Sequence, residues 1–332
     1  MNIAIVGATG NVGRKLLEVL EKKQFPIDEL FLIASSKSVG KKINFKGKEY
    51  SIHDLESFNF SSVKIAFFAA GSVIADKWAP IASKKTIVID NSKFFRMDPD
   101  VPLIVPEVNS KDLKDYKKKN IIANANCSVI PLVVALKPLH DLYNIKRIVA
   151  STYQSVSGAG KAPMDELLSQ TKDFFEGKEL NSKLFTKQIA FNAIPHIDSF
   201  LEDGYTKEEQ KMHDEVKKIL DSKIKITSTS VRIPVLISHA VSVNVEFNKK
   251  YKLNEIQNVL NTSPGCKVID EHKDGGYITP VEAENKFDTF ISRIREDNSQ
   301  DNTINLWIVS DNLLKGAALN AVEIAEALIK IR

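Results

Sequence analysis

The segment Asn126-Cys127-Ser128 has the residue types and the position of a nucleophilic site. It follows the strand-like run 121–125 and precedes the apolar, helix-like run 129–139. A cysteine at such a junction lies at or near a helix N-terminus, where unpaired amide donors stabilise a thiolate. Most single cysteines are packing residues, so position alone leaves both interpretations open. Cys266, in a Ser-Pro-Gly-Cys-Lys loop with no candidate base near it in sequence, is interpreted as structural.

Glycine recurs at every third position in the turn Gly7-Ala-Thr-Gly10-Asn-Val-Gly13. A short apolar segment, 2–6, precedes this turn, and an amphipathic segment, 14–23, follows it. Glycines between a strand and a helix allow a tight turn and a close approach of the backbone to a pyrophosphate at the helix N-terminus. The pattern predicts a dinucleotide site, with a purely structural glycine turn as the alternative.

The end of the second predicted strand, 30–34, indicates which dinucleotide binds. A protein specific for NAD usually places an acidic residue there for the ribose hydroxyl, whereas this chain has Ser35-Ser36-Lys37-Ser38. Hydroxyls and a lysine suit a 2′-phosphate, so the predicted cofactor is NADP. A polar loop that contains a lysine by chance is the alternative.

Three charged residues could bind ionic parts of a small substrate. Glu208 and Lys211 are spaced i, i+3 in a helix-like segment and share a face, although an ordinary surface ion pair would have the same spacing. Arg96 follows two phenylalanines, which would fix its aliphatic stem while the guanidinium offers a bidentate fork to phosphate.

Arg232 and His239 are seven residues apart, which in one regular strand would point them to opposite faces. Pro234 lies between them and cannot donate to a strand ladder. We therefore expect an irregular or bulged connection rather than one continuous strand. Histidine titrates near neutral pH, as an acid/base group must.

The order of predicted elements favours an α/β fold with two domains. Strand-like runs at 64–71, 86–90 and 121–124 alternate with helix-length or loop-length segments, which predicts a Rossmann-like, doubly wound parallel sheet. From residue 145 the strands are longer and alternate in polarity, which predicts a second, α+β domain. The apolar segment 313–331 is expected to be a buried helix that returns to the first domain. We expect residues 1–127 with 312–332 to form the NADP-binding domain and 128–311 the catalytic and dimerisation domain.

The composition is that of an ordinary soluble globular protein. The chain has 332 residues, of which 43% are hydrophobic and 27% charged, and a formal net charge of +4. The charge is spread over lysine-rich surface pieces without interleaved aromatic residues, so neither nucleic acid nor a membrane is an expected partner. The start of the chain shows no basic leader and no apolar run is long enough to span a bilayer, so we expect a cytoplasmic protein. The two cysteines form no recognisable metal or disulfide pattern, and no metal is expected.

The whole chain resembles the aspartate-semialdehyde dehydrogenase family of the shorter bacterial type. The motifs that carry the resemblance are GATGNVG (7–13), NSKFFRMDPDVPLIVPEVN (91–109), NANCS (124–128), QSVSGAG (154–160), EEQK (208–211), VRIPVLISH (231–239) and DNLLKGAALNAVEIAE (311–326). The resemblance implies NADPH-dependent reduction of L-aspartyl 4-phosphate to L-aspartate 4-semialdehyde with release of inorganic phosphate. This step serves lysine, threonine, methionine and diaminopimelate synthesis.

The resemblance also implies roles for individual residues. Cys127 would form an acyl thioester, with Asn126 beside the thiol. His239 would act as acid and base, and Gln154 would orient the acyl group. Arg232 would bind the substrate α-carboxylate and Glu208 its amino group, and Arg96 and Lys211 would bind phosphate. The residues that would bind the cofactor are Thr9, Gly10, Asn11, Val12, Gly13, Ser36, Lys37, Ser38, Ser157, Gly158 and Asn312.

Two other functions stay open on the sequence. N-acetyl-γ-glutamyl-phosphate reductase runs the same chemistry, but its cysteine typically lies in a Gly-Cys-Tyr context, and its acylated substrate has no free ammonium for Glu208. A non-catalytic NADP-binding regulator is the second alternative. We further expect a homodimer, with a tetramer as an extension, joined through residues 150–311 because the alternating strand 241–247 leaves a sheet face to be covered.

Overall fold

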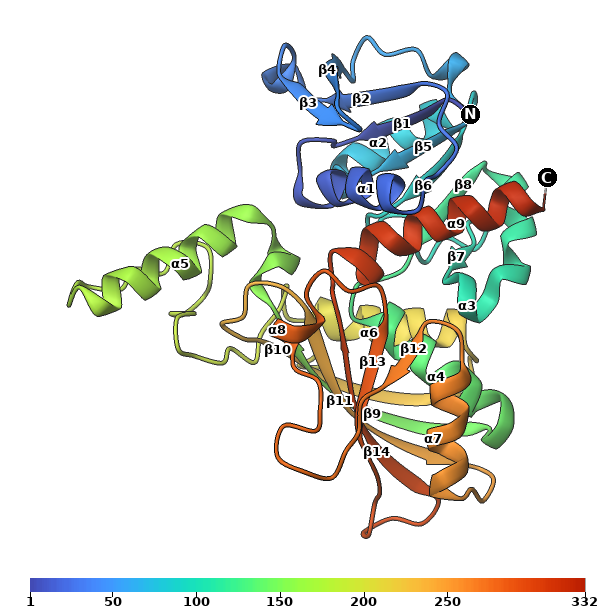
Figure 1. Ribbon diagram of the computed structural model, residues 1–332, viewed down its shortest axis with the longest axis vertical. Helices are drawn as coiled ribbons and strands as arrows, with labels where there is room; N and C mark the ends of the chain where they lie inside the picture. Colours follow the sequence, from blue (N-terminus) through green and yellow to red (C-terminus); the bar gives the residue numbers. More distant parts are fainter. Residues whose placement is uncertain (332) are drawn as a thin grey trace. The chain divides into compact units, whose positions relative to one another are not determined.

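The computed structural model describes residues 1–331 as two compact units. Of these residues, unit 1 comprises 1–125 and 317–331, and unit 2 comprises 126–316. The sequence predicted domain boundaries at 127/128 and 311/312. The structure has them at 125/126 and 316/317, so each boundary differs by a few residues from the prediction. Unit 1 therefore closes with the C-terminal segment, which returns to it after the whole of unit 2 (Figure 1).

Unit 1 is built on one eight-stranded sheet with the order β3-β4-β2-β1-β5-β6-β8-β7. All neighbouring strands run parallel except β3, which is antiparallel to β4. Every residue of β1 is buried, as expected for a central strand covered on both faces. The strands are β1 (Ile3–Val6), β2 (Leu30–Ala34), β3 (Lys42–Phe45), β4 (Lys48–Asp54), β5 (Ile65–Phe68), β6 (Ile87–Asp90), β7 (Leu103–Ile104) and β8 (Ile121–Asn124).

The helices of unit 1 follow from the strand order. From β1 the chain moves one way to β2, and from β5 it moves the other way to β6. Right-handed crossovers therefore place α1 and α2 on opposite faces, which makes the sheet doubly wound and puts a switch point beside β1. The helices are α1 (Asn11–Lys22), α2 (Ser72–Ala82), α3 (Pro106–Asn109) and α9 (Leu319–Lys330), with 3₁₀ segments at Ser36–Ser38, Phe60–Ser62 and Ser110–Lys118.

The hairpin β3–β4 was not among the predicted strands. Its residues are largely exposed or half-exposed, so no apolar alternation marks it in the sequence. The predicted parallel, doubly wound sheet is confirmed, and the hairpin adds one antiparallel strand at its edge, where a tight turn at Lys46-Gly47, both with positive φ, reverses the chain.

Unit 2 contains a six-stranded mixed sheet with the order β10-β9-β11-β14-β13-β12. The strands are β9 (Ile145–Gln154), β10 (Lys225–Arg232), β11 (His239–Phe247), β12 (Cys266–Val268), β13 (Thr289–Glu296) and β14 (Thr303–Ser310). The helices are α4 (Val129–Tyr143), α5 (Lys161–Phe175), α6 (Lys207–Ile219), α7 (Leu253–Thr262) and α8 (Pro280–Ala283), with a 3₁₀ segment at Val156–Ala159 and a π-helix at Leu314–Ala318.

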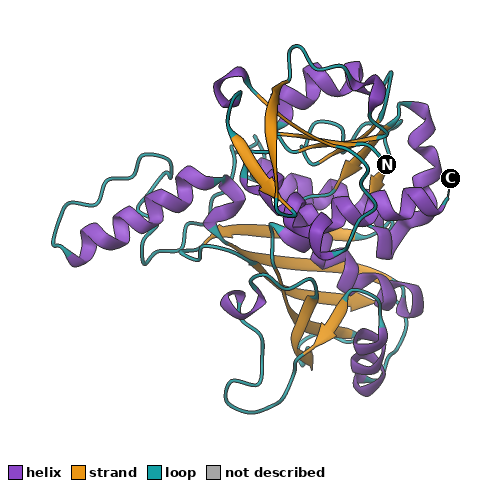
Figure 2. Ribbon diagram, turned by 45° about the horizontal axis from the view of Figure 1, so that its top comes forward, coloured by secondary structure: helices purple, strands orange, loops and turns teal. Residues whose placement is uncertain are grey.

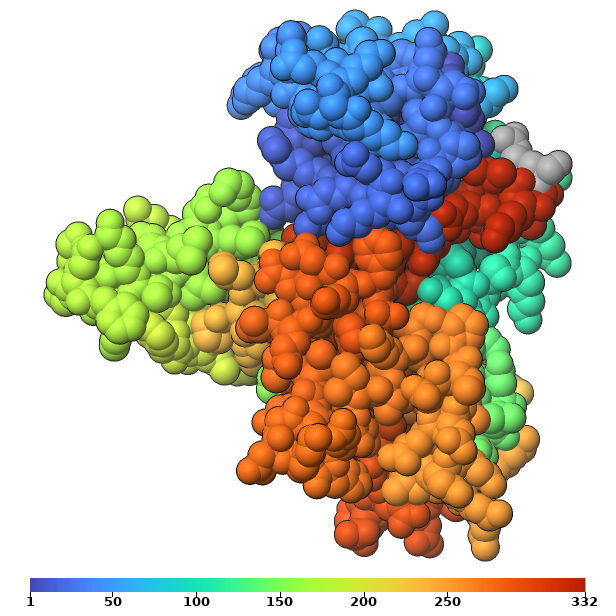
Figure 3. All heavy atoms as spheres, viewed as in Figure 1, coloured from blue at the N-terminus to red at the C-terminus, as the bar shows by residue number. Residues whose placement is uncertain are grey.

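Helices cover the two faces of this sheet to different extents. Helix α4 packs on β11, β13 and β14, α6 packs on β10, and α7 packs on β12 and β13. Side chains directed to the other face, such as Ser151, Ser242 and Trp307, are only half-buried. Helix α5 extends away from the sheet (Figures 1 and 2) and forms the yellow-green lobe of the space-filling view (Figure 3).

None of the helices described in residues 1–331 is long and apolar enough to cross a membrane. Within the same residues, no group of three or more histidine, cysteine, aspartate or glutamate side chains is arranged to hold a metal ion.

Candidate functional site

Asn126 organises the turn that carries the cysteine. Its side-chain Oδ1 accepts the amide of Ser128 at 2.8 Å, and its carbonyl accepts the amides of Val129 at 2.9 Å and Ile130 at 3.0 Å. These are donors that the start of α4 would otherwise leave unsatisfied, so Asn126 satisfies this end of the helix, whose N-cap position is held by Ser128. Cys127 lies between these two residues, at the N-terminus of α4, as the sequence predicts.

One part of that prediction is wrong. We expected unpaired amides at this helix end to face the thiolate, but the amides of Ser128, Val129 and Ile130 all donate to Asn126. The helix dipole still favours negative charge at Cys127. A side chain adds to this effect, because the guanidinium of Arg232 interacts electrostatically with Cys127.

A glycine of the π-helix gives the cysteine its space. A Cβ added at Gly316 would lie 3.0 Å from both Cβ and the carbonyl oxygen of Cys127. Any larger residue would push against the nucleophile turn. π-helical turns are rare and concentrate at functional sites, which fits a segment of this shape beside the cysteine.

Three strands bring Arg232, Gln154 and His239 into one row. Gln154 ends β9 and pairs with Arg232 of β10 on one side and with His239 of β11 on the other. Residues paired across adjacent strands direct their side chains to the same face. The predicted break between Arg232 and His239 is confirmed, since β10 ends at the first and β11 begins at the second. The break lets two residues seven apart share a face.

Glu208 connects this row to the cysteine turn. Its Oε1 accepts the side-chain amides of Asn126 at 3.0 Å and Gln154 at 3.2 Å, and its Oε2 lies 2.8 Å from Nζ of Lys211. Burial alone would raise the pKa of Glu208, but Lys211 and the two amides outweigh it, so the pKa lies below its ordinary value. The carboxylate is thus ionised and held on three sides.

The pKa values of the two cations in this cluster, Lys211 and Arg232, are also shifted. Burial lowers the pKa of Lys211, but Glu208 and Asp198, at 2.8 Å each, outweigh it and raise the pKa above the ordinary value. Burial lowers the pKa of Arg232, with Glu208 and Cys127 acting against it. Arg232 also donates to the Ser155 carbonyl at 2.6 Å, which fixes its direction.

His239 is buried and oriented through Nδ1. This nitrogen accepts the amide of Ser155 at 3.0 Å and lies 3.0 Å from the Ser155 hydroxyl. Nδ1 therefore carries no proton, and the neutral ring carries its proton on Nε2. Burial and the nearby Arg232 lower the pKa of His239 to about 3. No side chain or backbone group in residues 1–331 forms a hydrogen bond with Nε2, which leaves this N–H for a ligand.

Asn312 supports the histidine from behind. Its Oδ1 accepts the hydroxyls of Ser155 at 3.2 Å and Ser157 at 3.1 Å and the amide of Ser238 at 2.9 Å. Ser238, directly before His239, has φ of 75°, a strained value for a residue with a side chain. The Asn312 contact compensates for this conformation.

Gly158 covers the row of three residues. A Cβ added there would lie 3.1 Å from Nε2 of His239 and 3.2 Å from Nη1 of Arg232. Glycine keeps this space open above both side chains. Of the predicted residues, unit 2 thus brings together Asn126, Cys127, Gln154, Ser157, Gly158, Glu208, Lys211, Arg232, His239 and Asn312.

Unit 1 holds the predicted glycine turn between β1 and α1. Gly7 has φ of 86°, and an added Cβ would lie 2.5 Å from the carbonyl oxygen of Ala69. At Gly13 an added Cβ would lie 2.2 Å from the carbonyl oxygen of Gly7. The turn is therefore closed so tightly that only glycine fits at either end. The predicted Thr9 to Gly13 lie at the N-terminus of α1, where backbone amides can cradle a pyrophosphate.

The two other predicted groups of unit 1 also have defined places. Ser36–Ser38 forms a 3₁₀ turn directly after β2, with Lys37 exposed. Arg96 is buried, and its guanidinium donates to the carbonyls of Asn124 at 2.9 Å and Asn91 at 3.1 Å. These carbonyls follow β6 and end β8, so Arg96 is braced at the carboxyl edge of the sheet.

Four residues of the site had no predicted role. Ser155 holds His239, Gly316 makes room for Cys127, Ser238 takes the strained conformation, and Glu215 accepts the amide of Asn126 at 2.6 Å. Glu215 alone carried a readable signal, because it lies seven residues after Glu208 and so on the same helix face.

Comparisons with known proteins agree with this geometry. The family described as "Semialdehyde dehydrogenase, NAD binding domain" matches residues 2–116, and "Semialdehyde dehydrogenase, dimerisation domain" matches residues 136–315. Aspartate-semialdehyde dehydrogenase of Aquifex aeolicus is 52% identical over 332 residues, which cover 99% of this chain and 98% of the relative. That of Rickettsia bellii is 51% identical over 330 residues, with the same two shares.

A solved structure is similar over the same extent. The crystal structure of aspartate-semialdehyde dehydrogenase II of Vibrio cholerae, complexed with ASA, has a TM-score of 0.97 and 46% identity, covering 99% of this chain and 98% of that one. Two family descriptions, full-length relatives and a shared fold thus coincide with a cluster built around Cys127, and this chain belongs to the aspartate-semialdehyde dehydrogenases.

Proposed function

We propose that the protein catalyses the NADPH-dependent reductive dephosphorylation of L-aspartyl 4-phosphate to L-aspartate 4-semialdehyde through a thioester on Cys127. The observation that carries this proposal is the cluster of unit 2, in which one thiol, one neutral histidine and a set of fixed charges surround the turn at Asn126. The relatives are named aspartate-semialdehyde dehydrogenases, and the place we propose for this chain is in lysine, threonine, methionine and diaminopimelate synthesis.

The first half of the reaction uses Cys127. The thiolate attacks the acyl carbon, a carbon–sulfur bond forms, and the bond to the phosphate oxygen breaks, so that inorganic phosphate leaves with the bonding electrons. Lys211 and Arg96 are the proposed cations for this leaving group. Gln154, fixed between two strands and bonded to Glu208, orients the acyl carbonyl.

The second half uses His239. NADPH, when bound, supplies a hydride for the thioester carbonyl carbon. Negative charge then develops on the former carbonyl oxygen, and the Nε2–H of His239 is the hydrogen-bond donor that can stabilise it. As the tetrahedral species collapses, the carbonyl re-forms, the carbon–sulfur bond breaks, and the aldehyde and the thiolate separate.

The charges around the cluster suit a zwitterionic substrate. Arg232 presents a buried guanidinium whose direction is fixed by Ser155, which fits an α-carboxylate. Glu208 is ionised, which fits an α-ammonium. An N-acetylated substrate would offer an amide in place of this ammonium, so the charge on Glu208 favours the free amino acid over the N-acetyl-γ-glutamyl alternative.

NADP is the cofactor, and unit 1 has residues that fit it. The close approach of Gly13 to Gly7 leaves the backbone bare at the start of α1, as a pyrophosphate requires. The turn at Ser36–Ser38 offers two hydroxyls and an exposed lysine where the second strand ends, which suits a 2′-phosphate. Ser157, Gly158 and Asn312 remain predicted contacts from unit 2.

A coupled absorbance assay tests the reaction. NADPH should form continuously from NADP only when both aspartate 4-semialdehyde and inorganic phosphate are present, because phosphate must release the acyl group from Cys127 before the next turnover. N-acetylglutamate semialdehyde should give no signal. Activity with that compound alone would support the rival reductase, and no activity with either would support a non-catalytic protein.

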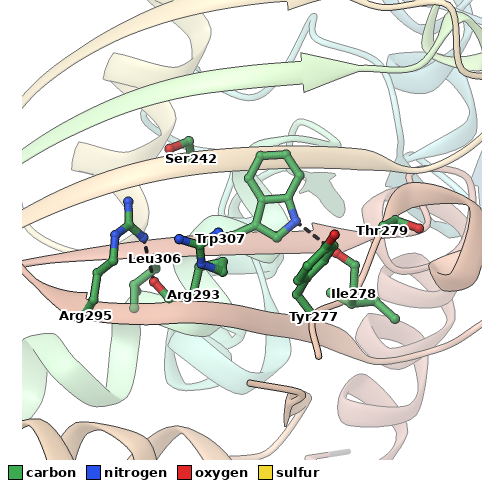
Figure 4. A pocket seen from close by; sticks show the side chains of 8 residues that line it. All are labelled: Ser242, Tyr277, Ile278, Thr279, Arg293, Arg295, Leu306 and Trp307. Carbon is green, nitrogen blue, oxygen red and sulfur yellow. Dashed lines mark hydrogen bonds between the residues drawn. The ribbon is translucent and has the colours of Figure 1, made fainter. Parts of the chain in front are cut away.

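We also propose a symmetric homodimer formed through the open face of the six-stranded sheet. Trp307, Arg293 and Arg295 line a pocket on this face, with the Trp307 indole donating to the Ile278 carbonyl at 3.0 Å (Figure 4). The half-buried side chains of Ser151, Ser242 and Trp307, on the adjacent strands β9, β11 and β14, extend this open face. The matching family is described as a dimerisation domain, and obligate interfaces bury more than about 2,000 Å².

Sedimentation of a single substitution tests this interface. Ser242→Arg places a charge at the centre of the open face and should convert dimer to monomer, whereas Lys48→Glu on the β3–β4 hairpin should not. A wild-type monomer with full activity would contradict the proposal. A tetramer would appear as a second, concentration-dependent species.

We also propose that the protein works in the cytoplasm, because a reducing compartment keeps the thiol of Cys127 free.

A further inference from the structure

Glu215 is a buried carboxylate, 1% exposed, that takes no part in the chemistry described above. It lies on α6, two helical turns after Glu208. Thr206 and Glu209 form a reciprocal capping box that fixes where α6 begins. Because residues seven apart lie on one helix face, Glu208 and Glu215 are presented in the same direction.

Both carboxylates of this face bind the same asparagine. Glu208 accepts the side-chain amide of Asn126 at 3.0 Å, and Glu215 accepts the backbone amide of Asn126 at 2.6 Å. Asn126 in turn holds the amides of Ser128, Val129 and Ile130. The backbone on both sides of Cys127 is therefore fixed by one residue, and that residue is fixed by α6.

The contact with Glu215 is the one that acts on the main chain. A charged acceptor makes a shorter and stronger hydrogen bond with an amide than a neutral acceptor does, and 2.6 Å is short for such a pair. A backbone amide has one direction, so this bond sets the orientation of the peptide plane that joins Ala125 to Asn126, one residue before the cysteine. A shift of that plane would move the sulfur relative to Arg232.

We propose that Glu215 is a positioning residue that orients the Asn126 peptide and thereby sets where Cys127 presents its thiolate. The inference rests on the proposed role of Cys127 as nucleophile and deepens it. It assigns to α6 a second task, besides carrying the substrate-binding Glu208 and Lys211. Glu215 does not touch substrate, since its carboxylate is turned to the main chain of the nucleophile turn.

Glu215→Gln and Glu215→Met form a matched pair for the test. Both remove the charge and nearly keep the length, but only glutamine keeps an acceptor for the Asn126 amide. The measurement is the pH dependence of iodoacetamide alkylation, followed on the peptide that contains Cys127. We expect the midpoint of the methionine variant about one pH unit above that of the glutamine variant, because the thiolate loses its place beside Arg232.

Turnover gives the second readout. The kcat of Glu215→Met should be about 100-fold below that of Glu215→Gln, as misplacement of a reacting group costs on this order. The KM for NADP should stay within about twofold, because the substitution does not touch cofactor-binding residues. Equal midpoints and equal kcat values in the two folded variants would overturn the proposal.

Glu209 is the control. It is also a buried carboxylate of α6, but it accepts the backbone amides of Ser230 at 2.9 Å and Thr206 at 2.7 Å rather than that of Asn126. Glu209→Met and Glu209→Gln should therefore differ in thermal stability but have the same alkylation midpoint. A midpoint difference as large as that at Glu215 would show a general effect of disturbing α6 and would also overturn the proposal.

A further variant covers the case in which Glu215→Met does not fold. Glu215→Asp keeps the charge of the wild type and withdraws the acceptor by one methylene, so its midpoint should rise above that of the wild type. An Asp variant indistinguishable from the wild type would contradict the positioning role. Alkylation needs no turnover, so these results stay separate from the assay of the proposed reaction.

Discussion

The glycine turn of unit 1 and the side-chain cluster of unit 2 are built in opposite ways. The first offers backbone amides within one stretch of seven residues, 7–13, and depends on the absence of Cβ atoms. The second gathers side chains from α6 and three strands around the cysteine turn, with partners as much as 157 residues apart in sequence.

This difference follows from what each site must do. Phosphate groups can be held by amides that a helix N-terminus supplies whatever its side chains are. Acyl transfer needs a sulfur, a proton donor and fixed charges, each with its own pKa. Substitutions in the cluster of unit 2 should therefore stop the reaction, whereas those in the cofactor residues of unit 1 should change how the cofactor binds.

The largest expected effect is that of Cys127→Ser. Turnover should fall by on the order of 10⁴-fold or more, because a serine hydroxyl near neutral pH is a far weaker nucleophile than a thiolate. NADP binding, measured by fluorescence titration, should be unchanged. Cys266→Ser is the control, since the Cys266 thiol lies 3.6 Å from the Val134 carbonyl and has a packing environment. Loss of activity in the Cys266 variant alone would reverse the assignment.

A smaller effect should appear in the stability of the protein at acid pH. Burial and Arg232 depress the pKa of His239 from 6.5 to about 3, so the unfolded state binds a proton that the folded state does not. Stability must then fall as pH falls from about 6.5 towards 3. Between pH ~7 and pH ~5 this one group should cost about 2 kcal/mol.

The pH effect is measured by urea unfolding of the wild type and of His239→Gln at both pH values. Glutamine keeps an acceptor for the Ser155 amide but does not titrate. The wild type should lose about 2 kcal/mol more than the variant over this range. Parallel pH profiles would show that His239 titrates normally in the folded protein and would remove the argument for a neutral Nε2–H donor.

The smallest expected effect concerns unit 1. Lys37→Glu should lower the affinity for NADP relative to NAD by about tenfold or more, because a like charge would meet the 2′-phosphate. Alkylation of Cys127 should stay unchanged, which would confirm that the two sites can be altered separately. Wild-type protein with equal affinities for both cofactors would remove the assigned role of Ser36, Lys37 and Ser38.

How far the sequence predicts each site depends on the same contrast. The turn at 7–13 is local, so a strand, three glycines and a helix are enough to place it. The nucleophile turn is also local, and Pro234 is enough to predict that Arg232 and His239 lie on separate strands. What the sequence does not show is that both flank Gln154, because that depends on the register of β9 with two partners.

The residues that were missed share a physical reason. Ser155 donates its own main-chain amide to His239, 84 residues away, and Glu215 accepts the amide of Asn126, 89 residues away. No periodicity in the sequence reports such contacts. The β3–β4 hairpin was missed because an edge hairpin with exposed side chains has no apolar pattern. The amides at the start of α4 were misjudged because the side chain of Asn126 takes one of the donors that a bare helix end would leave open.

The most direct test of the central claim is the mass of the enzyme caught between the two half-reactions. Protein mixed with aspartate 4-semialdehyde and NADP, but without phosphate, should form about one NADPH per active site and then stop. The peptide that contains Cys127 should gain the mass of one aspartyl group, and added phosphate should remove it. Rapid, continuous NADPH formation without phosphate, or the aspartyl group on any other residue, would contradict the account.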